Sequence, residues 1–402
     1  MSGTESGPVT MPWKREHPCP FNPPAQLDQL REEEPVTRLR FPDGHEGWLV
    51  TSYPIARQLL ADNRFSARQD LRHFPIVLPF AEQTMAGPTA PPGFFNRMDP
   101  PEHTRYRRLL TGYFTVRRMA QLTPRLERIA EDHLDRMQAQ NPPLDLMEHY
   151  AIPLPSLMIC ELLGVPYEDR DEFNYHAGVA LSMESTPEQV GTTLRFIAGY
   201  LDTLVRVKRA APGDDMLSDL IVDGKLTDDE VKGVTTLFLA GHETTVNMIG
   251  MGVYALLTHS DQLRTLLADP SLIEGTTEEL LRFLAILNAG LTRGALEDVE
   301  LGGQHVKAGE TVVISVPAVN WDPARFPSPA TLDITRPPTG HLTFGHGVHQ
   351  CLGQQLVRIE MRIAYLSLFR RFPGLRLAVP AGDVPLRGEM TVHGVHRLPV
   401  TW

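Results

Sequence analysis

The chain of 402 residues is 42% hydrophobic and 22% charged, the proportions of an ordinary globular protein that can bury a large core. Its formal net charge of -11 excludes a general nucleic-acid-binding surface, although a local basic patch is compatible with it. Cys19, Cys160 and Cys351 lie far apart, which argues against a disulfide framework and predicts a reducing compartment. Residues 1–24 contain no basic start followed by an apolar core, so we predict a cytoplasmic protein without a membrane anchor.

Strands are predicted mainly near the two ends of the chain. Residues 35–41 and 46–52 flank a Pro-Asp-Gly turn and predict a pair of short strands. Residues 298–303 and 310–315 predict a second strand pair, and 396–402 predict a final extended run. Helical patterns fill most of the length between them. We therefore predict a mainly α fold with small β-sheets, because alternating βαβ units are absent from the pattern.

Two long segments, 71–98 and 322–343, are irregular, and loops of this length are usually functional or disordered. The first is too apolar for a solvated linker, so it predicts a lid or wall over an apolar pocket. A loop that packs only on its own core remains the alternative interpretation.

A helix is predicted to begin at Asp99, with this residue as N-cap and a proline at the first helical position. His103 and Arg107 are four residues apart and share one helical face, where two donors can bind a carboxylate. Arg105 and Arg108 project from the other side of this helix.

The longest helical pattern covers residues 227–257 and opens with a capping box at 227–230. At about 1.5 Å per residue this predicts a nearly continuous helix of roughly 45 Å. His242, Glu243 and Asn247 occupy its middle, where charge in a bilayer costs about 2.5–3.5 kcal/mol. A buried central helix is therefore favoured over a membrane span.

The run 344–353, FGHGVHQCLG, places a cysteine just ahead of a helical pattern at 352–369. Its three glycines permit a close approach to a flat, bulky group. A helix N-terminus lowers the pKa of a cysteine and stabilises its thiolate, and a thiolate axial ligand favours O–O cleavage on haem iron. A buried cysteine considered alone is more often an inert small hydrophobe.

This ten-residue run resembles the haem-binding signature of the cytochrome P450 superfamily at every defining position. The resemblance implies a triangular, α-rich prism formed by residues 1–402 as one domain. It implies haem b bound between the long helix and the helix after Cys351, with Cys351 as the iron ligand. Phe344 is expected beside the thiolate, and His349 near a haem propionate.

Residues 240–245, AGHETT, resemble the distal-helix motif of the same superfamily. The small Ala240 and Gly241 leave room for dioxygen and for a local opening of the helix, while Glu243 and Thr244 offer an acid and a hydroxyl for a water-assisted proton relay. The alternative is that Thr244 only bonds back to the preceding turn and that Glu243 is a satisfied buried acid.

The resemblance also assigns propionate binding to Arg293, together with the face that carries His103 and Arg107. It further implies a structural triad that locks the loop before the cysteine, formed by Glu279, Arg282 and Arg336. Trp321 departs from the pattern, which has a basic residue beside the asparagine. The complete predicted cofactor-binding set is His103, Arg107, Ala240, Gly241, Arg293, Phe344, His349, Cys351 and Gly353.

The function implied is a monooxygenase that inserts one oxygen atom from O2 into an apolar natural product of polyketide or terpenoid type. Electrons would come from NAD(P)H through ferredoxin reductase and an acidic ferredoxin, and the protein would be a monomer. Substrate contacts are predicted from residues 71–98, 170–205, 288–291 and 390–392. Ferredoxin docking is predicted on Arg105, Arg108, Arg358 and Arg362.

A noncatalytic haem-thiolate sensor and a peroxide-driven peroxygenase are the alternatives. The acid and threonine at Glu243 and Thr244 count against both, because neither function needs a proton relay to dioxygen.

Overall fold

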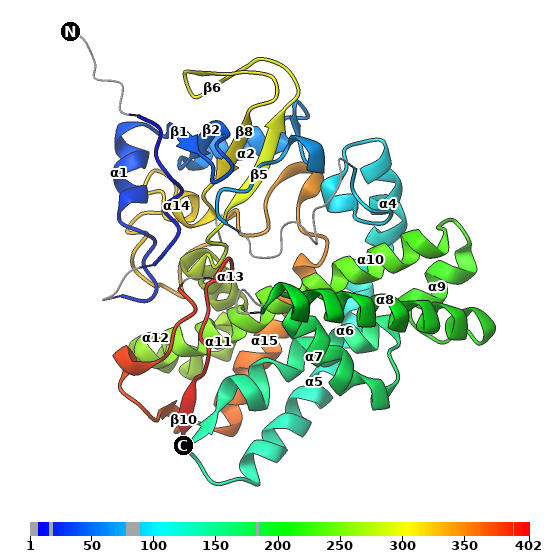
Figure 1. The fold of residues 1–402 in the computed structure, drawn as a ribbon. Helices are drawn as coiled ribbons and strands as arrows, with labels where there is room; N and C mark the ends of the chain where they lie inside the picture. Colours follow the sequence, from blue (N-terminus) through cyan, green and yellow to red (C-terminus); the bar gives the residue numbers. More distant parts are fainter. Residues whose placement is uncertain (1–6, 16–18, 78–88, 182–184, 339, 389) are drawn as a thin grey trace.

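The computed structural model describes residues 7–15, 19–77, 89–181, 185–338, 340–388 and 390–402. Helices dominate the molecule, as predicted, and the small sheets lie apart, with the largest sheet at one end and another small sheet beside the C-terminus at the other (Figure 1). The helices are α1 (Gln26–Glu33), α2 (Tyr53–Ala61), α4 (Glu102–Leu110), α5 (Val116–Gln138), α6 (Pro153–Leu163), α7 (Arg170–Leu181), α8 (Pro187–Ala210), α9 (Met216–Asp223), α10 (Asp228–Ala240), α11 (His242–Thr258), α12 (Ser260–Ala268), α13 (Ile273–Leu284), α14 (Val316–Asn320) and α15 (Gln354–Arg371).

The strands are short and form three sheets in the described chain. They are β1 (Val36–Arg40), β2 (Glu46–Val50), β3 (Phe65–Ser66), β4 (Leu144–Asp145), β5 (Leu291–Ala295), β6 (Val299–Leu301), β7 (Gln304–Val306), β8 (Thr311–Ile314), β9 (Arg376–Leu377) and β10 (Pro399–Thr401). The largest sheet has the order β1-β2-β8-β5-β3, and β10 pairs with β4 and β9.

The predicted pairing of 298–303 with 310–315 is wrong. β6 pairs with β7 instead, because Gly302 and Gly303 adopt φ values of 56° and 83° and close a tight hairpin between them. The fully buried strand β8 lies inside the large sheet, parallel to β2 and antiparallel to β5. The pair predicted near the N-terminus is confirmed as β1 and β2.

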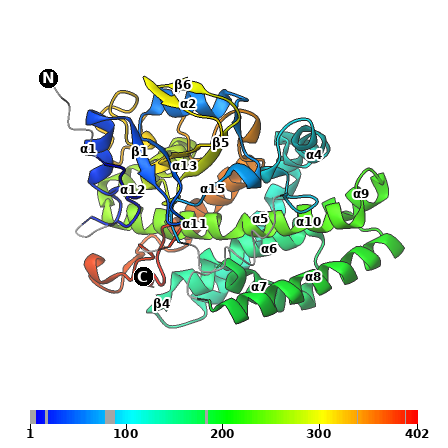
Figure 2. The ribbon, with the colours of Figure 1, turned by 45° about the horizontal axis from the view of Figure 1, so that its top comes forward.

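The long central helix is interrupted. α10 ends at Ala240 and α11 begins at His242, and the two halves cross the helical part of the molecule (Figures 1 and 2). The amide of Gly241 donates to the carbonyl of Phe238 at 3.0 Å, one residue closer than α-helical bonding requires. The expected local opening at Gly241 is therefore present, but continuity over 227–257 is not.

The start of α4 also differs from the prediction. The helix begins at Glu102 with Pro101 as N-cap, and Asp99 does not cap it through its side chain. The Asp99 carboxylate accepts hydrogen bonds from Ser66 Oγ and from the amide of Ala67 at 2.9 Å. Asp99 thus joins the segment before α4 to β3.

The core between α11 and α15 is tightly packed. Gly252 lies so close to Tyr365 that an added Cβ would stand 2.0 Å from its hydroxyl oxygen, and that hydroxyl donates to the carbonyl of Met248 at 2.8 Å. This close approach fixes α15 against the second half of the central helix.

The structure brings the predicted triad together. Arg282 donates to Glu279 from Nε at 2.8 Å and Nη2 at 2.7 Å, and Arg336 Nε lies 3.1 Å from Glu279 Oε2. Arg282 also binds the carbonyls of Asn320 and Pro329, which tie α13 to the loop leading to the cysteine. The side chains of Glu279 and Arg282 are both 2% exposed, so each charge depends on the other.

Glu279→Gln should lower the free energy of unfolding by about 3–5 kcal/mol, because it leaves the buried Arg282 without its counter-ion. Chemical denaturation measures this. Glu274→Gln on the same helix breaks the exposed pair with Arg362 and should cost less than about 1 kcal/mol. Equal losses in the two variants would contradict the prediction.

Candidate active site

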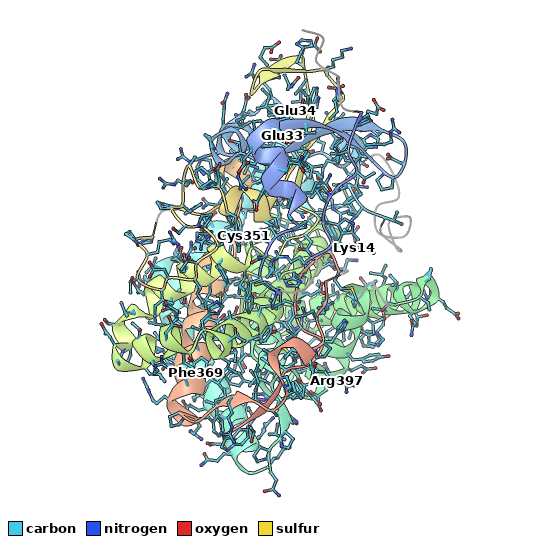
Figure 3. All side chains as sticks on the ribbon, turned by 90° about the vertical axis from the view of Figure 1, so that its left-hand side faces the viewer. Lys14, Glu33, Glu34, Cys351, Phe369 and Arg397 are labelled. Carbon is cyan, nitrogen blue, oxygen red and sulfur yellow. The ribbon has the colours of Figure 1, made fainter. Side chains whose placement is uncertain are left out.

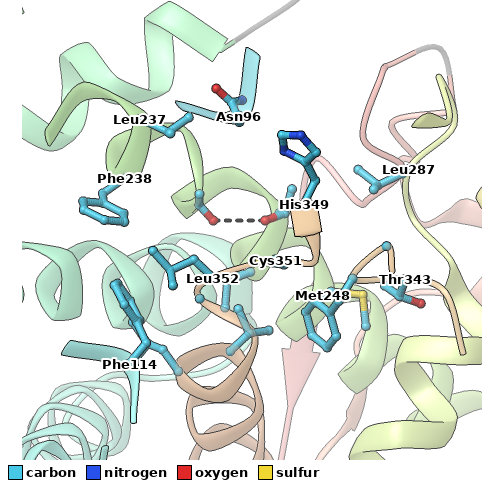
Figure 4. Close-up of a pocket in the computed structure, with 18 of the residues that line it drawn as sticks. Asn96, Phe114, Leu237, Phe238, Met248, Leu287, Thr343, His349, Cys351 and Leu352 are labelled. Atoms are coloured by element: carbon cyan, nitrogen blue, oxygen red, sulfur yellow. Dashed lines mark hydrogen bonds between the residues drawn. The ribbon is translucent and has the colours of Figure 1, made fainter. Parts of the chain in front are cut away.

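A cavity of about 420 Å³ lies between the central helix and the start of α15. Its wall is mostly apolar, and Cys351 lies at its centre (Figure 4). Figure 3 places Cys351 between the β-rich end and the helical end of the molecule. The side chains labelled around it in Figure 4 are Asn96, Phe114, Leu237, Phe238, Met248, Leu287, Thr343, His349 and Leu352.

The predicted cofactor set converges on this cavity. Residues from α4, β5, the cysteine loop and the central helix all line it, although they are far apart in sequence. The predicted residues among its lining are His103, Arg107, Gly241, Thr244, Arg293, Phe344, His349, Cys351 and Gly353. The side chain of Ala240 lies outside the described residues.

The predicted substrate segments contribute unequally. Segment 71–98 supplies Phe95 and Asn96, and Leu291 comes from 288–291. Residues 78–88 lie outside the described residues. Among described side chains, none from 170–205 or 390–392 lines the cavity. Segments 71–98 and 288–291 are therefore each part of the cavity wall, as predicted, whereas the described side chains of 170–205 and 390–392 do not support their assignment.

The cysteine loop owes its shape to glycines with left-handed backbone. Gly347 has a φ of 73°, and a Cβ there would stand 2.2 Å from the carbonyl oxygen of Leu60. The amide of Cys351 donates to the carbonyl of Phe344 at 2.8 Å, which closes the loop just before α15. The Cys351 side chain is held at the cavity by this turn.

The charge environment of Cys351 differs from the prediction. Although the side chain opens on the cavity, desolvation by the surrounding protein raises the pKa of its thiol above the ordinary value, whereas the helix start was expected to lower it. Backbone hydrogen bonds from Gly353 and Gln354 at the helix start lower the pKa, as predicted, and the nearby charges of Arg107 and Arg358 also lower it. A bound metal ion would supply the remaining positive charge that a thiolate needs.

Buried arginine and histidine side chains gather on one side of the cavity. Burial lowers the pKa of Arg293 to about 10, and burial together with Arg107 lowers that of His103 to about 4. Burial together with Arg293 lowers the pKa of His349 to about 3. The rings of His103 and His349 lie 4.2 Å apart, and neither ring nitrogen of His103 has a hydrogen-bond partner in the described chain.

Arg72 belongs to this group, and sequence reasoning missed it. It donates from Nε to Thr292 Oγ1 at 2.8 Å, beside Arg293, and burial together with Arg293 lowers its pKa to about 9. No ion pair with a described carboxylate is formed by Arg72, Arg107 or Arg293. Buried charges are normally paired, so the group requires an anion, and the carboxylates of haem fit this requirement.

In the turn between α10 and α11, Thr244 adopts the alternative arrangement, in which its hydroxyl bonds back to the preceding turn of the helix. Its hydroxyl donates to the carbonyl of Gly241 at 3.0 Å, the contact drawn as a dashed line in Figure 4. Glu243 is paired with Arg387, with a distance of 2.7 Å from Oε1 to Nη2. Burial raises the pKa of Glu243, and Arg387 opposes this rise. No local sequence pattern identifies Arg387 as the partner of Glu243, because the two residues are 144 positions apart in the chain.

Glu360 has an unexpected position. It does not pair with the arginines of its own helix, because Arg358 pairs with Glu278 and Arg362 with Glu274. Glu360 instead lines the cavity, its Oε1 has no hydrogen-bond partner in the described chain, and burial raises its pKa to about 8.

Trp321, the departure from the family pattern, has a structural role. Its Nε1 donates to the carbonyl of Phe283 at 2.9 Å, and its ring stacks on Phe283 with centroids 5.4 Å apart. An aromatic side chain thus makes the contacts at this position of the loop.

An apolar cavity, a cysteine at a helix start and buried arginines that pair with no described carboxylate together fit the binding of haem through a thiolate. The family model described as Cytochrome P450 matches residues 265–391. Cytochrome P450 105C1 from a Streptomyces species is 49% identical, covering 99% of this chain and 100% of that protein. The chain belongs to the cytochrome P450 family, whose related members are haem monooxygenases.

Further similarities extend over nearly the whole chain. Pentalenic acid synthase of Streptomyces avermitilis is 43% identical and covers 99% of this chain and 98% of its own length. The crystal structure of CYP105P1 in complex with filipin I is 44% identical, with a TM-score of 0.90 over 98% of this chain and 99% of the other. None of the helices in the described ranges combines the length and the hydropathy needed to cross a membrane.

Arg72→Leu should accelerate haem loss by about 10–100-fold, because a hydrogen bond to a charged group contributes roughly 1.5–3 kcal/mol. Transfer of haem to an apoprotein acceptor measures the rate. Arg68→Leu is the matched control, since Arg68 is half exposed and pairs with Asp70. Equal rates for Arg72→Leu and the wild type would exclude Arg72 from the anion site.

Glu360→Gln should stabilise the protein more at pH 8 than at pH 5. The folded-state pKa of about 8 lies above the ordinary 4.5, so the folded wild type holds a proton that the unfolded chain releases. Wild-type stability therefore falls as pH rises through this window, whereas glutamine does not titrate. The difference in unfolding free energy between the two proteins, measured by denaturation across that range, should not stay constant.

Proposed function

We propose that this chain is a haem b monooxygenase that inserts one oxygen atom from O2 into an apolar natural product by hydroxylation or epoxidation. The observation that carries the proposal is the presence of Cys351, the unpaired cations and the apolar wall on one cavity. Electrons would come from NAD(P)H through ferredoxin reductase and an acidic ferredoxin. The proposed setting, a monomer in the cytoplasm, comes from the sequence alone.

The names of the relatives support an apolar natural product as substrate. One relative is called pentalenic acid synthase, another vitamin D3 dihydroxylase, and the structure of CYP105P1 was determined with filipin I. The wall formed by Phe114, Leu237 and Phe238 offers the apolar surface that such compounds need. These names favour a terpenoid or polyketide class without selecting one compound.

When bound, haem iron would supply the site at which dioxygen is reduced and cleaved. Cys351 would donate its thiolate from the start of α15, and the arginine and histidine group would hold the propionates. The apolar wall excludes bulk water from the reacting side. Thr244 Oγ1 would hold a water at the opening of the central helix. Protons would then pass one after another through this water to the cavity.

Cys351→His should abolish the strongly red-shifted absorption that a thiolate-bound haem shows in the reduced, carbon monoxide-bound protein. Retention of that band would exclude Cys351 as the ligand. A library of apolar compounds, screened by the shift of the haem band, then supplies a substrate for turnover with NAD(P)H and a surrogate ferredoxin system. Product formation that depends on NAD(P)H distinguishes a monooxygenase from a sensor.

Thr244→Ala tests the proton relay in the same turnover assay. It should release more peroxide per NAD(P)H and form less product, since acid-base assistance commonly contributes about 10²–10⁴-fold. Full activity with peroxide alone and none with NAD(P)H would favour the peroxygenase alternative.

The proposed docking surface changes once ion pairs are considered. Arg105 pairs with Glu230 at 2.5 Å, and Arg358 and Arg362 are paired within the protein. Arg108 is exposed and forms no ion pair with a described residue. Of the four arginines, Arg108 is therefore the best candidate contact for an acidic ferredoxin.

Arg108→Glu should slow ferredoxin-supported reduction a fewfold at low salt and less at high salt, because an exposed charge pair contributes roughly 0.2–1 kcal/mol. Stopped-flow reduction at several ionic strengths measures this. Turnover supported by peroxide should remain normal. An unchanged salt dependence would place the docking surface elsewhere.

A further inference from the structure

Arg15 is an arginine of the N-terminal segment whose charge is desolvated without a carboxylate partner in the described chain. It also lies outside the cavity lining. Desolvation by the surrounding protein lowers the pKa of its guanidinium to about 9. A desolvated charge is costly unless hydrogen bonds replace the lost water. The hydrogen bonds of Arg15 therefore indicate its role.

The Arg15 guanidinium binds four neutral oxygens, three of which lie at the end of α13 and in the turn after it. Its Nη2 donates to the main-chain carbonyls of Leu284 at 2.9 Å and Ala285 at 2.7 Å. Its Nε donates to Asn288 Oδ1 at 3.0 Å. Its Nη1 donates to the carbonyl of Phe21 at 3.0 Å, within the N-terminal segment. One side chain thus ties that segment to the turn after α13.

The turn after α13 gains support that its own backbone does not provide. α13 ends at Leu284, and the last carbonyls of a helix have no amide partners within the helix. Ala285 has a φ of 39°, a left-handed conformation that residues with a side chain rarely adopt. A cation at the C-terminus of a helix also interacts favourably with the helix dipole. Arg15 therefore stabilises an otherwise unfavourable turn.

The same turn continues into the cavity wall. Ile286 and Leu287 line the cavity, and Figure 4 shows Leu287 beside it. The amide of His393 donates to the carbonyl of Ile286 at 2.8 Å, and the amide of Asn288 donates to the carbonyl of Thr391 at 2.9 Å. This part of the wall is thus held by two segments from opposite ends of the chain.

Asn288 joins the two supports. Its Oδ1 accepts from Arg15, while its Nδ2 donates to the carbonyl of Met390 at 3.1 Å. The residue is buried, so water does not replace a lost partner. Burial together with Arg15 lowers the pKa of His393 to about 3, so this neighbouring histidine is neutral and does not substitute for the arginine.

We propose that Arg15 is a positioning residue for the substrate, because it fixes the turn after α13 and with it the wall formed by Ile286 and Leu287. A wall held in place selects rigid apolar molecules that match its shape, since binding does not have to order those side chains. The N-terminal segment thus takes part in substrate selection without touching the substrate. The selection rests on the proposed monooxygenase function, whereas the anchoring of the wall does not.

The first test measures amide hydrogen exchange in the complete holoprotein. The reporting amides are those of Asn288 and His393, which bond the wall to the C-terminal segment. Arg15→Gln should speed exchange at both by about 10–100-fold, because the adjoining turn loses hydrogen bonds to a charged group. The amides of α8 should exchange as in the wild type.

Two further variants control this test. Arg15→Lys should restore part of the protection, since it keeps the charge but not the planar fork. Lys14→Met is the matched control and should exchange like the wild type, because Lys14 is an exposed cation one residue earlier in the same segment (Figure 3). Unchanged exchange at Asn288 and His393 in Arg15→Gln would overturn the proposal. Equal acceleration in α8 would also overturn it, because it would show only a general loss of stability.

The second test compares two iron-binding probes by absorption titration. Imidazole offers no apolar group to the wall, whereas 4-phenylimidazole places an aromatic ring in the cavity. Arg15→Gln should weaken binding of 4-phenylimidazole about 5–100-fold, because Ile286 and Leu287 then have to be ordered on binding. The affinity for imidazole should stay at the wild-type value. Leu287→Ala shortens the wall directly, and its loss should not add in full to that of Arg15→Gln.

The outcomes of the probe titration separate the wall from the haem site. Equal losses for both probes in Arg15→Gln would indicate a general change at the haem and would contradict the proposal. Fully additive losses with Leu287→Ala would contradict it too. Probe binding needs haem but no turnover. Absence of NAD(P)H-dependent product in the wild type would therefore overturn the proposed function, while altered binding of the larger probe would still support the role of Arg15.

Discussion

Uncompensated positive charge inside the protein is the constraint on which the active site depends. Arg72, Arg107 and Arg293 are drawn from a loop, a helix and a strand, and all are desolvated without a described carboxylate to pair with. Such burial is costly unless an anion completes the site. The chain is therefore built around its ligand, and ligand binding must contribute to the stability of the folded state. The paired network at Glu279 and Arg282, by contrast, is complete within the protein itself.

The two buried acids near the cavity have different environments and so suit different tasks. Glu360 faces the cavity without a cation, and its pKa of about 8 keeps it protonated at neutral pH. Glu243 has a cation at hydrogen-bonding distance and a position away from the cavity. A residue that must accept and release protons needs a balance between burial and a charged partner, and only Glu243 has both.

Much of the site could be predicted because its signals are local. The glycines around Cys351 and the spacing of His103 and Arg107 each lie within one short segment, where the chemistry is readable from neighbouring residues. Arg387 and Arg72 could not be found in this way, since their partners are 144 and 220 residues away and a single sequence does not state which distant charges meet. The same limit explains the wrong strand pairing of 298–303, because β8 finds its partners in β2 and β5. A local opening of the helix at Gly241 was predicted from its small residues. The complete break between α10 and α11 was not, because it depends on tertiary contacts.

The C-terminal segment contacts both the cavity wall and Glu243. Val392 forms a bridge with Leu287, and Leu287 lines the cavity, while the amide of Asn288 donates to the carbonyl of Thr391 at 2.9 Å. A few residues away the same segment carries Arg387, which holds Glu243. Because a Cβ at Gly394 would clash with Asn247, a glycine at this position lets the C-terminal segment pack directly on α11 beside the ion pair.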